Sequence, residues 1–221
     1  MKWPSSSVYL KNIRRKFMYQ VQILVSLLLL LTLGCSSLEV KEYISEDGIL
    51  EQYQVERESG QRHGWYKRYQ QNTLREECNY QYDQLDGQRV LYDGTGSKVV
   101  VEHYVNGIYE GAYQSYYPTG ELKLEGLYVR GSMEGEWNKY YFSGQLMEIV
   151  EMHDNEENGA FVEYYENGSI KAEGSYLEGD NEHGELKLYD ESGELERTMQ
   201  CDRGICHTTW KRESDNTTED L

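Results

Sequence analysis

Apolar and polar residues alternate along this chain in short runs, and the runs recur at steps of 23 to 25 residues. Each copy begins at a glycine, carries an apolar or aromatic side chain two residues later in five of six copies, and has a tyrosine five residues later. We number the copies as units one to six by their first glycines, which are Gly64, Gly87, Gly111, Gly135, Gly159 and Gly184. A period of 20 to 50 residues indicates stacked supersecondary units.

A second turn divides each unit into two short strands. Its residues are Asn72, Gly96, Gly120, Gly144, Gly168 and Gly193, and Gly48 starts this column one period earlier. Glycine suits a tight hairpin because it adopts positive φ without strain. Past this turn, one apolar column stands at two residues and a large-residue column at eight, so even spacing predicts that both lie on one face. Glu77, Glu125 and Glu173 have the opposite parity and are predicted to face water.

These patterns predict an all-β protein. We expect about six and a half tandem antiparallel β-hairpin units of ~24 residues over residues 43–210, forming an elongated, twisted, single-layer sheet or solenoid, with 205–210 as a closing half-unit. Outside the first 35 residues no sustained helical stripe of apolar residues occurs. Only 38% of the 221 residues are apolar while 21 are tyrosine, which suits a thin structure rather than a thick core.

The segment from Tyr164-Tyr165-Glu166-Asn167-Gly168 through Glu173-Gly174-Ser175-Tyr176 to His183-Gly184 resembles the MORN-repeat variant of bacterial proteins of the YwqK antitoxin-component type. The resemblance covers residues 43–210, and the residues that match are those that build the hairpin. It implies a hairpin-repeat scaffold, and it also implies an antitoxin or immunity role against a cognate toxin.

The N-terminus has the order of a signal peptide. Residues 11–16 are basic, residues 21–34 are apolar apart from three positions, and Cys35 follows directly. About 14 apolar residues are short for a membrane-spanning helix, which needs ~20. Leu31-Thr32-Leu33-Gly34-Cys35 resembles the lipobox of bacterial lipoproteins. That resemblance implies a signal peptide at 1–34, a lipidated Cys35 with a tether over 35–42, and, since Ser36 follows, an outer-membrane lipoprotein facing the periplasm or the cell surface. The alternative is an uncleaved anchor with an incidental thiol.

Charge narrows the range of partners. Residues 1–35 hold five Lys/Arg and no acids, so the formal charge of −17 for the whole chain leaves −22 for the rest. Such a surface repels nucleic-acid phosphates, and we exclude nucleic acid as a partner. Solubility alone explains the acidity better than a dedicated cation site does.

No motif for chemistry stands out. His63, His103, His153, His183 and His207 lack the short spacing of zinc ligands. Asp154-Asn-Glu-Glu-Asn-Gly159 resembles a calcium loop faintly, but Tyr165 occupies its twelfth position. The chain has no nucleophile elbow and no phosphate-binding glycine loop, and nothing supports a carbohydrate-active enzyme with paired Glu. We therefore predict a protein that is not an enzyme and that binds neither a metal nor a cofactor.

The cysteines differ in their predicted roles. Cys201 and Cys206 flank a short turn, and in an exported chain we expect a disulfide between them, contributing about 2 kcal/mol; two free thiols are the alternative. Cys78 has no nearby partner and is predicted to be a small buried hydrophobe. Residues 211–221 are polar and acidic, and we expect a disordered tail.

Three central units have a doubled tyrosine. Tyr117, Tyr141 and Tyr165 directly follow the tyrosine column, where the outer units carry Gln70, Asp93 and Asp190. One tyrosine of each pair should point outward and could form a protein-binding strip, although packing that only stabilises the sheet is at least as good an interpretation. The leading hypothesis is a non-enzymatic, membrane-anchored repeat scaffold at the bacterial cell envelope that binds a protein; the alternative is an antitoxin or immunity protein.

Overall fold

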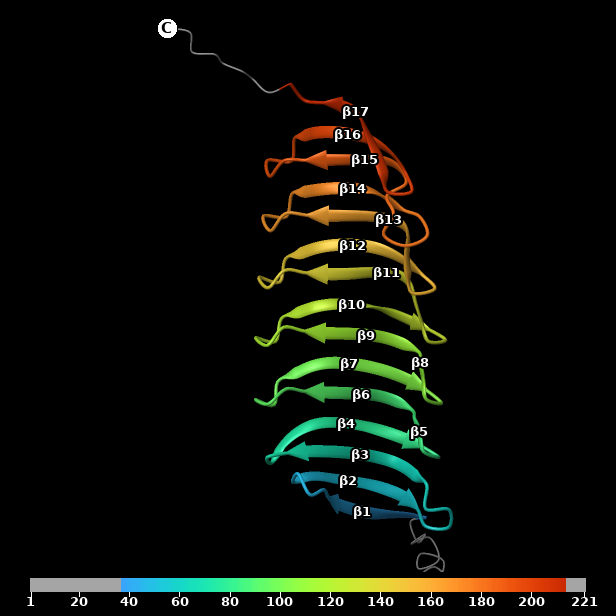
Figure 1. Ribbon diagram of the computed structural model, residues 1–221. Helices are drawn as coiled ribbons and strands as arrows, with labels where there is room; N and C mark the ends of the chain where they lie inside the picture. Colours follow the sequence, from blue (N-terminus) through green and yellow to red (C-terminus); the bar gives the residue numbers. More distant parts are fainter. Residues whose placement is uncertain (1–36, 214–221) are drawn as a thin grey trace, which may run out of the picture. The chain divides into compact units, whose positions relative to one another are not determined.

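The computed structural model describes residues 37–213, which form one antiparallel sheet of 17 strands. Pairing follows the order of the chain, with β5 and β6 sharing one position and β8 and β9 another, so the sheet grows in one direction from β1 to β17 (Figure 1). The strands are β1 Leu38–Ile44, β2 Ile49–Glu56, β3 Arg62–Gln70, β4 Thr73–Gln81, β5 Gln84–Leu85, β6 Gly87–Tyr92, β7 Lys98–Val105, β8 Ile108–Tyr109, β9 Gly111–Tyr116, β10 Leu122–Val129, β11 Ser132–Tyr140, β12 Leu146–His153, β13 Glu156–Tyr164, β14 Ile170–Tyr176, β15 Gly184–Tyr189, β16 Leu195–Asp202 and β17 Ile205–Lys211. The predicted all-β fold of tandem hairpins in a single layer is confirmed.

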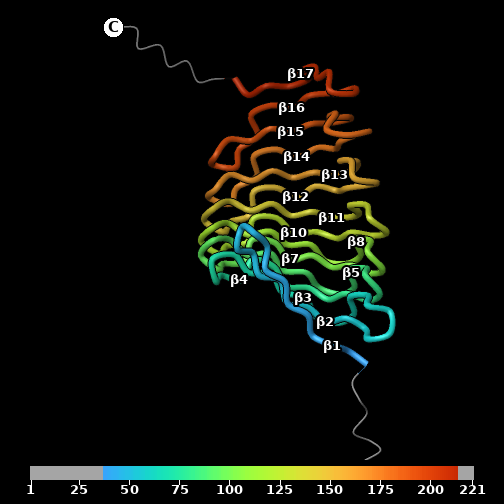
Figure 2. Tube along the Cα trace, turned by 60° about the horizontal axis from the view of Figure 1, so that its bottom comes forward, coloured from blue at the N-terminus to red at the C-terminus, as the bar shows by residue number. Residues whose placement is uncertain are grey.

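Two positions in the sheet are shared by two strands each. β5 and β6 both pair with β4, and β8 and β9 both pair with β7, so the 17 strands fill 15 positions. These positions make seven hairpins and a closing strand, one hairpin more than the six units, because β1 and β2 pair around Gly48 before unit one. In the described residues β1 pairs only with β2 and β17 only with β16, so the sheet stays open (Figure 2).

The ends of the repeat region differ slightly from the predicted boundaries. β1 begins at Leu38, inside the segment predicted to be a tether, and β17 runs to Lys211, the first residue of the predicted tail. The predicted signal peptide, Cys35 and residues 214–221 of the tail lie outside the described residues.

Unit five shows how the internal turn is made. The backbone N–H of Gly168 donates to the carbonyl of Tyr165 at 2.9 Å, and the Asn167 side chain accepts from the N–H of Ser169 at 2.9 Å. Gly168 has a φ of 86°, in the left-handed region that glycine adopts without strain. Unit one has a shorter turn, in which Gln71 and Asn72 both have positive φ, and Asn72, at 62°, is a residue type that tolerates this better than most.

Every unit carries a β-bulge just past its internal turn. In unit four Lys139 lies opposite Glu148 and Tyr140 opposite Leu146, so one extra residue separates the two partners on β12. The same shift occurs in the other five units. The bulge puts Leu146 on the face of Tyr140, away from Met152. The prediction that the columns two and eight places past the turn share a face is therefore wrong, because even spacing holds only for an unbroken strand.

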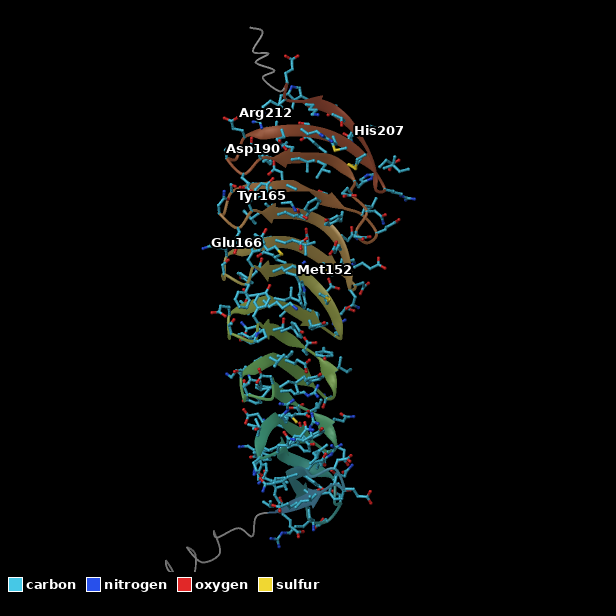
Figure 3. The ribbon with its side chains drawn as sticks, turned by 60° about the vertical axis from the view of Figure 1, so that its left-hand side comes forward. Met152, Tyr165, Glu166, Asp190, His207 and Arg212 are labelled. Carbon is cyan, nitrogen blue, oxygen red and sulfur yellow. A yellow bond between two sulfur atoms is a disulfide. The ribbon has the colours of Figure 1, made fainter. Side chains whose placement is uncertain are left out.

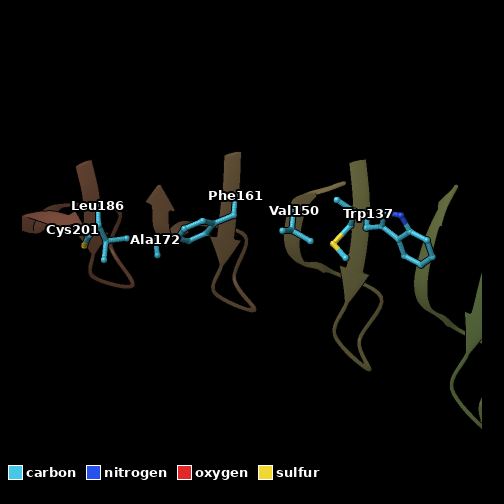
Figure 4. Close-up of a cluster of buried hydrophobic side chains, with 7 residues drawn as sticks. Trp137, Val150, Phe161, Ala172, Leu186 and Cys201 are labelled. Atoms are coloured by element: carbon cyan, nitrogen blue, oxygen red, sulfur yellow. The ribbon is translucent and has the colours of Figure 1, made fainter. Parts of the chain in front are cut away.

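The hydrophobic core lies along one face of the sheet, which we call the core face. Figure 4 shows its largest cluster as a series of side chains on successive strands. Its buried members are Trp137, Val150, Met152, Phe161, Ala172, Leu186 and Cys201. Stacked rings extend it toward the N-terminus: Tyr109 lies 4.5 Å from Tyr104 and 4.8 Å from Tyr128, and Tyr128 meets the Trp137 ring edge-on at 5.4 Å. Neighbouring units thus bury each other's aromatic surface, as a one-layer repeat requires.

The opposite face has its own polar order. The tyrosine column lies there, and three of its hydroxyls donate to carboxylates of an adjacent strand. The pairs are Tyr92 with Glu77, Tyr140 with Glu125, and Tyr189 with Glu173, at 2.5, 2.7 and 2.8 Å. These glutamates were predicted to face water. They do lie away from the core, but they are half-buried and act as hydrogen-bond acceptors that join one unit to the next.

The last strand is fastened at both ends. The structure joins Cys201 and Cys206 in a disulfide across β16 and β17. At the other end Arg212 forms ion pairs with Asp190 and with Glu194, the latter at 2.7 Å, and Figure 3 shows Asp190 and Arg212 together at the turn edge. These bonds hold β17 against unit six, where a terminal strand otherwise frays.

Candidate functional site

The three doubled tyrosines lie at the start of the internal turns and bridge successive units. The hydroxyl of Tyr117 donates to the carbonyl of Tyr140, that of Tyr141 to Tyr164, and that of Tyr165 to Tyr189, at 2.8, 2.7 and 2.8 Å. All three rings are half-buried. Each hydroxyl reaches exactly one unit further along the sheet, which is the behaviour that the packing interpretation predicts.

A partner-binding role for these tyrosines stays a prediction. Their hydroxyls already have acceptors, so a partner would meet ring edges rather than free donors. The exposed aromatic side chain beside them is Phe142, which packs edge-on against Tyr117 with ring centroids 5.3 Å apart. The sequence pattern does not indicate Phe142, because this residue is not part of a repeated column.

The predicted lipidation site, Cys35, lies outside the described residues, so the structure does not bear on it. Among residues 37–213, no helix has the length and apolarity needed to cross a membrane.

The histidines make local bonds. His153 contacts Glu134 at 3.0 Å, His183 lies 3.4 Å from Asp202, and His103 bonds to the carbonyl of Ala112 at 2.8 Å. Within the part of the chain that the structure describes, no three His, Cys, Asp or Glu side chains gather in a way that could hold a metal ion. Cys78 is a free, buried thiol whose pKa burial raises to about 12.

The core face changes character along the sheet. In units one and two it holds an ionic cluster: Arg89 binds Glu76 at 2.8 Å and Glu102 at 3.2 Å. Both carboxylates are buried, and Tyr104 and Tyr109 each donate a hydroxyl to Glu102 at 3.0 Å. Every charge in the cluster has a partner, which makes burial tolerable.

In units three to five the core face is apolar and contains a cavity of about 250 Å³. Its apolar lining comes from three adjacent strands, β10, β11 and β12, and consists of Leu124, Met133, Trp137, Val150 and Met152. Trp137 is 2% exposed, and its ring covers Gly126, where a Cβ would come within 2.1 Å of the indole. The indole Nε1 is buried and has no hydrogen-bond partner among the described residues.

Charged side chains complete the lining of this cavity. Lys123 and Lys139 stand on β10 and β11, and Glu148 and Glu157 on β12 and β13. Lys139 lies 3.6 Å from Glu148. The charge around the cavity therefore changes from positive to negative in the direction of the C-terminus.

Lys139 balances the acidic side of the cavity only in part. Burial, and then the nearby charges of Glu148 and Asp180, raise the pKa of Glu157, and Lys139 only partly offsets them. The same field acts on Tyr176, whose pKa is raised first by burial and then by Glu157 and its neighbours. No hydrogen bond or ion pair reaches the Glu157 carboxylate from residues 37–213. A cation placed beside Glu157 would relieve this repulsion.

No motif or repeated column in the sequence indicates this cavity. Lys123 reaches it because it is the extra residue of a bulge, and Glu157 because it lies opposite Met152 at a second irregularity. Neither position belongs to a repeated column or to a known motif, so no linear pattern marks it.

The part of the sheet that contains the cavity also matches a known protein family. A family model described as the MORN repeat variant matches residues 109–130, 133–154, 157–178 and 182–200. These segments correspond to units three to six, which are therefore similar in sequence to that repeat. No curated protein matches the chain.

Proposed function

We propose that this protein, whose units three to six are similar to MORN repeats, is a non-catalytic scaffold that binds a protein partner on the core face of its sheet and is tethered to the bacterial cell envelope through Cys35. One observation carries the proposal: in residues 37–213 no second layer packs on the core face, and an apolar cavity opens there beside Trp137. Repeat scaffolds use such extended surfaces to bind other proteins.

The tether is supported by the order of the N-terminal residues, a basic segment, an apolar run and Cys35. β1 begins three residues after Cys35, so a lipid on this cysteine would hold the first hairpin close to the membrane surface. Metabolic labelling with palmitate tests this directly. Incorporation into the wild-type chain that disappears in Cys35→Ser supports the anchor, and incorporation that persists contradicts it.

Site-specific photo-crosslinking in the native host tests the binding role. The photoreactive residue p-benzoylphenylalanine replaces Lys139, beside the cavity, or Ser175, which is exposed on the opposite face. We expect a discrete cross-linked protein from position 139 and none from position 175. Equal cross-linking from both positions, or none from either, contradicts a partner site on the core face.

An antitoxin or immunity role is the alternative, and the net charge of −22 outside the first 35 residues supports it, since an acidic sheet suits a basic toxin. The cross-linked partner separates the two. A toxin whose activity the chain abolishes in a growth assay favours immunity, whereas a partner without toxicity, together with unchanged growth on deletion of the chain, favours the scaffold.

A further inference from the structure

We propose that the cavity beside Trp137 binds an apolar side chain of the partner that is followed directly by a lysine or arginine, with the basic group directed toward Glu157. This inference rests on the proposed function and specifies the chemistry of its partner.

The size and lining of the cavity fit one side chain. A volume of about 250 Å³ exceeds that of a leucine or phenylalanine side chain, and the lining from Leu124, Val150 and Met152 offers apolar contact on several sides. Val150 and Met152 are each 8% exposed, so their positions are fixed by packing before a partner arrives. A preformed apolar pocket of this kind typically receives the central anchor residue of an interface.

The charges around the cavity select the neighbour of that anchor. Lys139 is 50% exposed and extends into solvent, while Glu148, at 17%, is much more enclosed. Glu148 is paired with Lys139, whereas the partly buried carboxylate of Glu157 has no hydrogen-bond or ion-pair partner in the described residues, and Asp180 acts on it from beyond the cavity. Negative charge therefore accumulates on the β13 side, where a cation from the partner would gain most and an acidic residue would be repelled.

Peptide titrations on the purified full chain in detergent micelles test the proposal. The probes are three blocked tetrapeptides: acetyl-Gly-Leu-Lys-Gly-amide, its Leu-Glu counterpart and its Ser-Lys counterpart. The readout is the indole N–H resonance of Trp137, one of four tryptophans, identified by its absence in Trp137→Phe. We expect a saturable shift with Leu-Lys, about tenfold weaker binding of Leu-Glu, and no saturation with Ser-Lys.

A charge reversal with a matched control makes the test specific. In Glu157→Lys the preference should invert, so that Leu-Glu binds more tightly than Leu-Lys. Glu166→Lys makes the same change of net charge at an exposed turn, away from Met152 (Figure 3), and should keep the wild-type preference. Thermal melting of each variant establishes that it is folded.

Each result has a defined meaning. Equal binding of Leu-Lys and Leu-Glu to the wild-type chain, or a preference unchanged by Glu157→Lys, overturns the inference. If the peptides fail while position 139 still cross-links a protein, the scaffold function stands and only the assigned partner chemistry is lost. If the peptides discriminate as expected but no protein is captured, the pocket is real and the proposed function fails.

Discussion

The two halves of this sheet share one backbone plan and differ in what fills the core face. Across β4 to β7 the central positions of that face are the free thiol Cys78 and the residues Arg89 and Glu102, which belong to the ionic cluster. Across β11 to β13 the equivalent positions are Trp137, Val150 and Phe161, packed as an apolar cluster. The bulge after the internal turn recurs in both halves, and the glycine turn recurs in every unit except unit one, whose turn is the shorter pair Gln71 and Asn72.

The difference shows that hairpin geometry and core chemistry are separable in this fold. The turns, which fix the backbone, need particular φ angles, whereas the core face needs only that each buried group be satisfied. The family model matches units three to six, which have an aromatic or aliphatic residue at the position that Arg89 occupies in unit two. The open cavity also lies in this apolar half.

Removing the largest apolar side chain should have the greatest effect. Trp137→Ala deletes a side chain that is 2% exposed, and we expect it to lower the free energy of unfolding by about 4 kcal/mol. Urea denaturation followed by circular dichroism measures this. Trp65→Ala, a half-buried tryptophan on the opposite face, should cost much less, and equal losses would contradict the assignment of the core to one face.

Breaking the ionic cluster should cause the next largest loss of stability. Arg89→Leu removes the cation shared by two buried carboxylates, so that Glu102 loses its ion pair and Glu76 keeps only Arg68, for an expected loss of about 3 kcal/mol. Adding Glu76→Gln and Glu102→Gln to this variant removes the buried negative charges and should restore most of the stability in the same urea assay. Failure of that rescue would mean that the N-terminal half requires its charges and that the two interiors are not interchangeable.

A single methyl group tests how closely the apolar half is packed. Gly126→Ala would place a Cβ against the Trp137 ring, and we expect a loss of about 2 kcal/mol as the ring is displaced. Gly94→Ala, in the N-terminal half, meets only the end of the flexible Arg75 side chain and should change stability by less than about 0.5 kcal/mol. Similar losses at both sites in thermal melts would show that Trp137 does not pack as described.

The tyrosine bridges should contribute less. Tyr141→Phe removes the hydroxyl that reaches the carbonyl of Tyr164, and we expect a loss of about 1 kcal/mol by urea denaturation. In unit two, Asp93 stands at the same position and accepts from the N–H groups of Thr95 and Ser97 within its own turn. Amide exchange should therefore speed up in the next unit for Tyr141→Phe but stay local for Asp93→Ala.

The smallest expected effect is a pH dependence of stability that only the C-terminal half shows. The hydrogen bond to Glu134 raises the pKa of His153, so the stability it adds is present below the unfolded value of 6.5 and is lost as the pH rises through the raised folded value. Glu134 has its pKa lowered, first by the N–H of Asp154 and then by His153, so its contribution disappears only in acid. A comparable ion pair near a turn of the N-terminal half is Arg62 with Asp83, and the charge of this arginine does not change over the same pH range.

Matched variants reveal this difference. The gap in urea midpoint between the wild-type chain and His153→Gln should be present at about pH 5.5 and close by about pH 8.5, while the gap for Arg62→Gln should stay constant over that range. A constant gap for both variants would contradict the titration of His153.

The repeat could be predicted from the sequence because its signals are local. Gly168 and Asn167 define a turn within a few residues, and the same spacing recurs in six units. A turn that is ambiguous in one unit can therefore be placed from the other units. The face of each side chain could not be predicted as well. A bulge after every turn shifts the parity, and Leu146 lies on the face opposite to Met152 although the two are six residues apart.

The candidate site could be predicted from the sequence even less well than the face of each side chain. The sequence marks Tyr117, Tyr141 and Tyr165 because only the three central units carry a second tyrosine. Their hydroxyls bond to carbonyls 23 or 24 residues away, and these contacts exist only in the stacked sheet. The cavity beside Trp137 combines residues from four strands. Nothing in a linear pattern indicates which of many Lys and Glu side chains meet there.

The sequence by itself determined the hairpin, its period and the all-β class, because turn chemistry and short-range alternation act between residues that are neighbours in the chain. Only the tertiary structure decided which face buries its side chains, that an ionic cluster serves as core in one half and an aromatic cluster in the other, and where the core face stays open beside Trp137 and Glu157. The physical reason is that burial, ion pairing and cavity shape depend on contacts between units, and these contacts exist only after the strands have stacked in register.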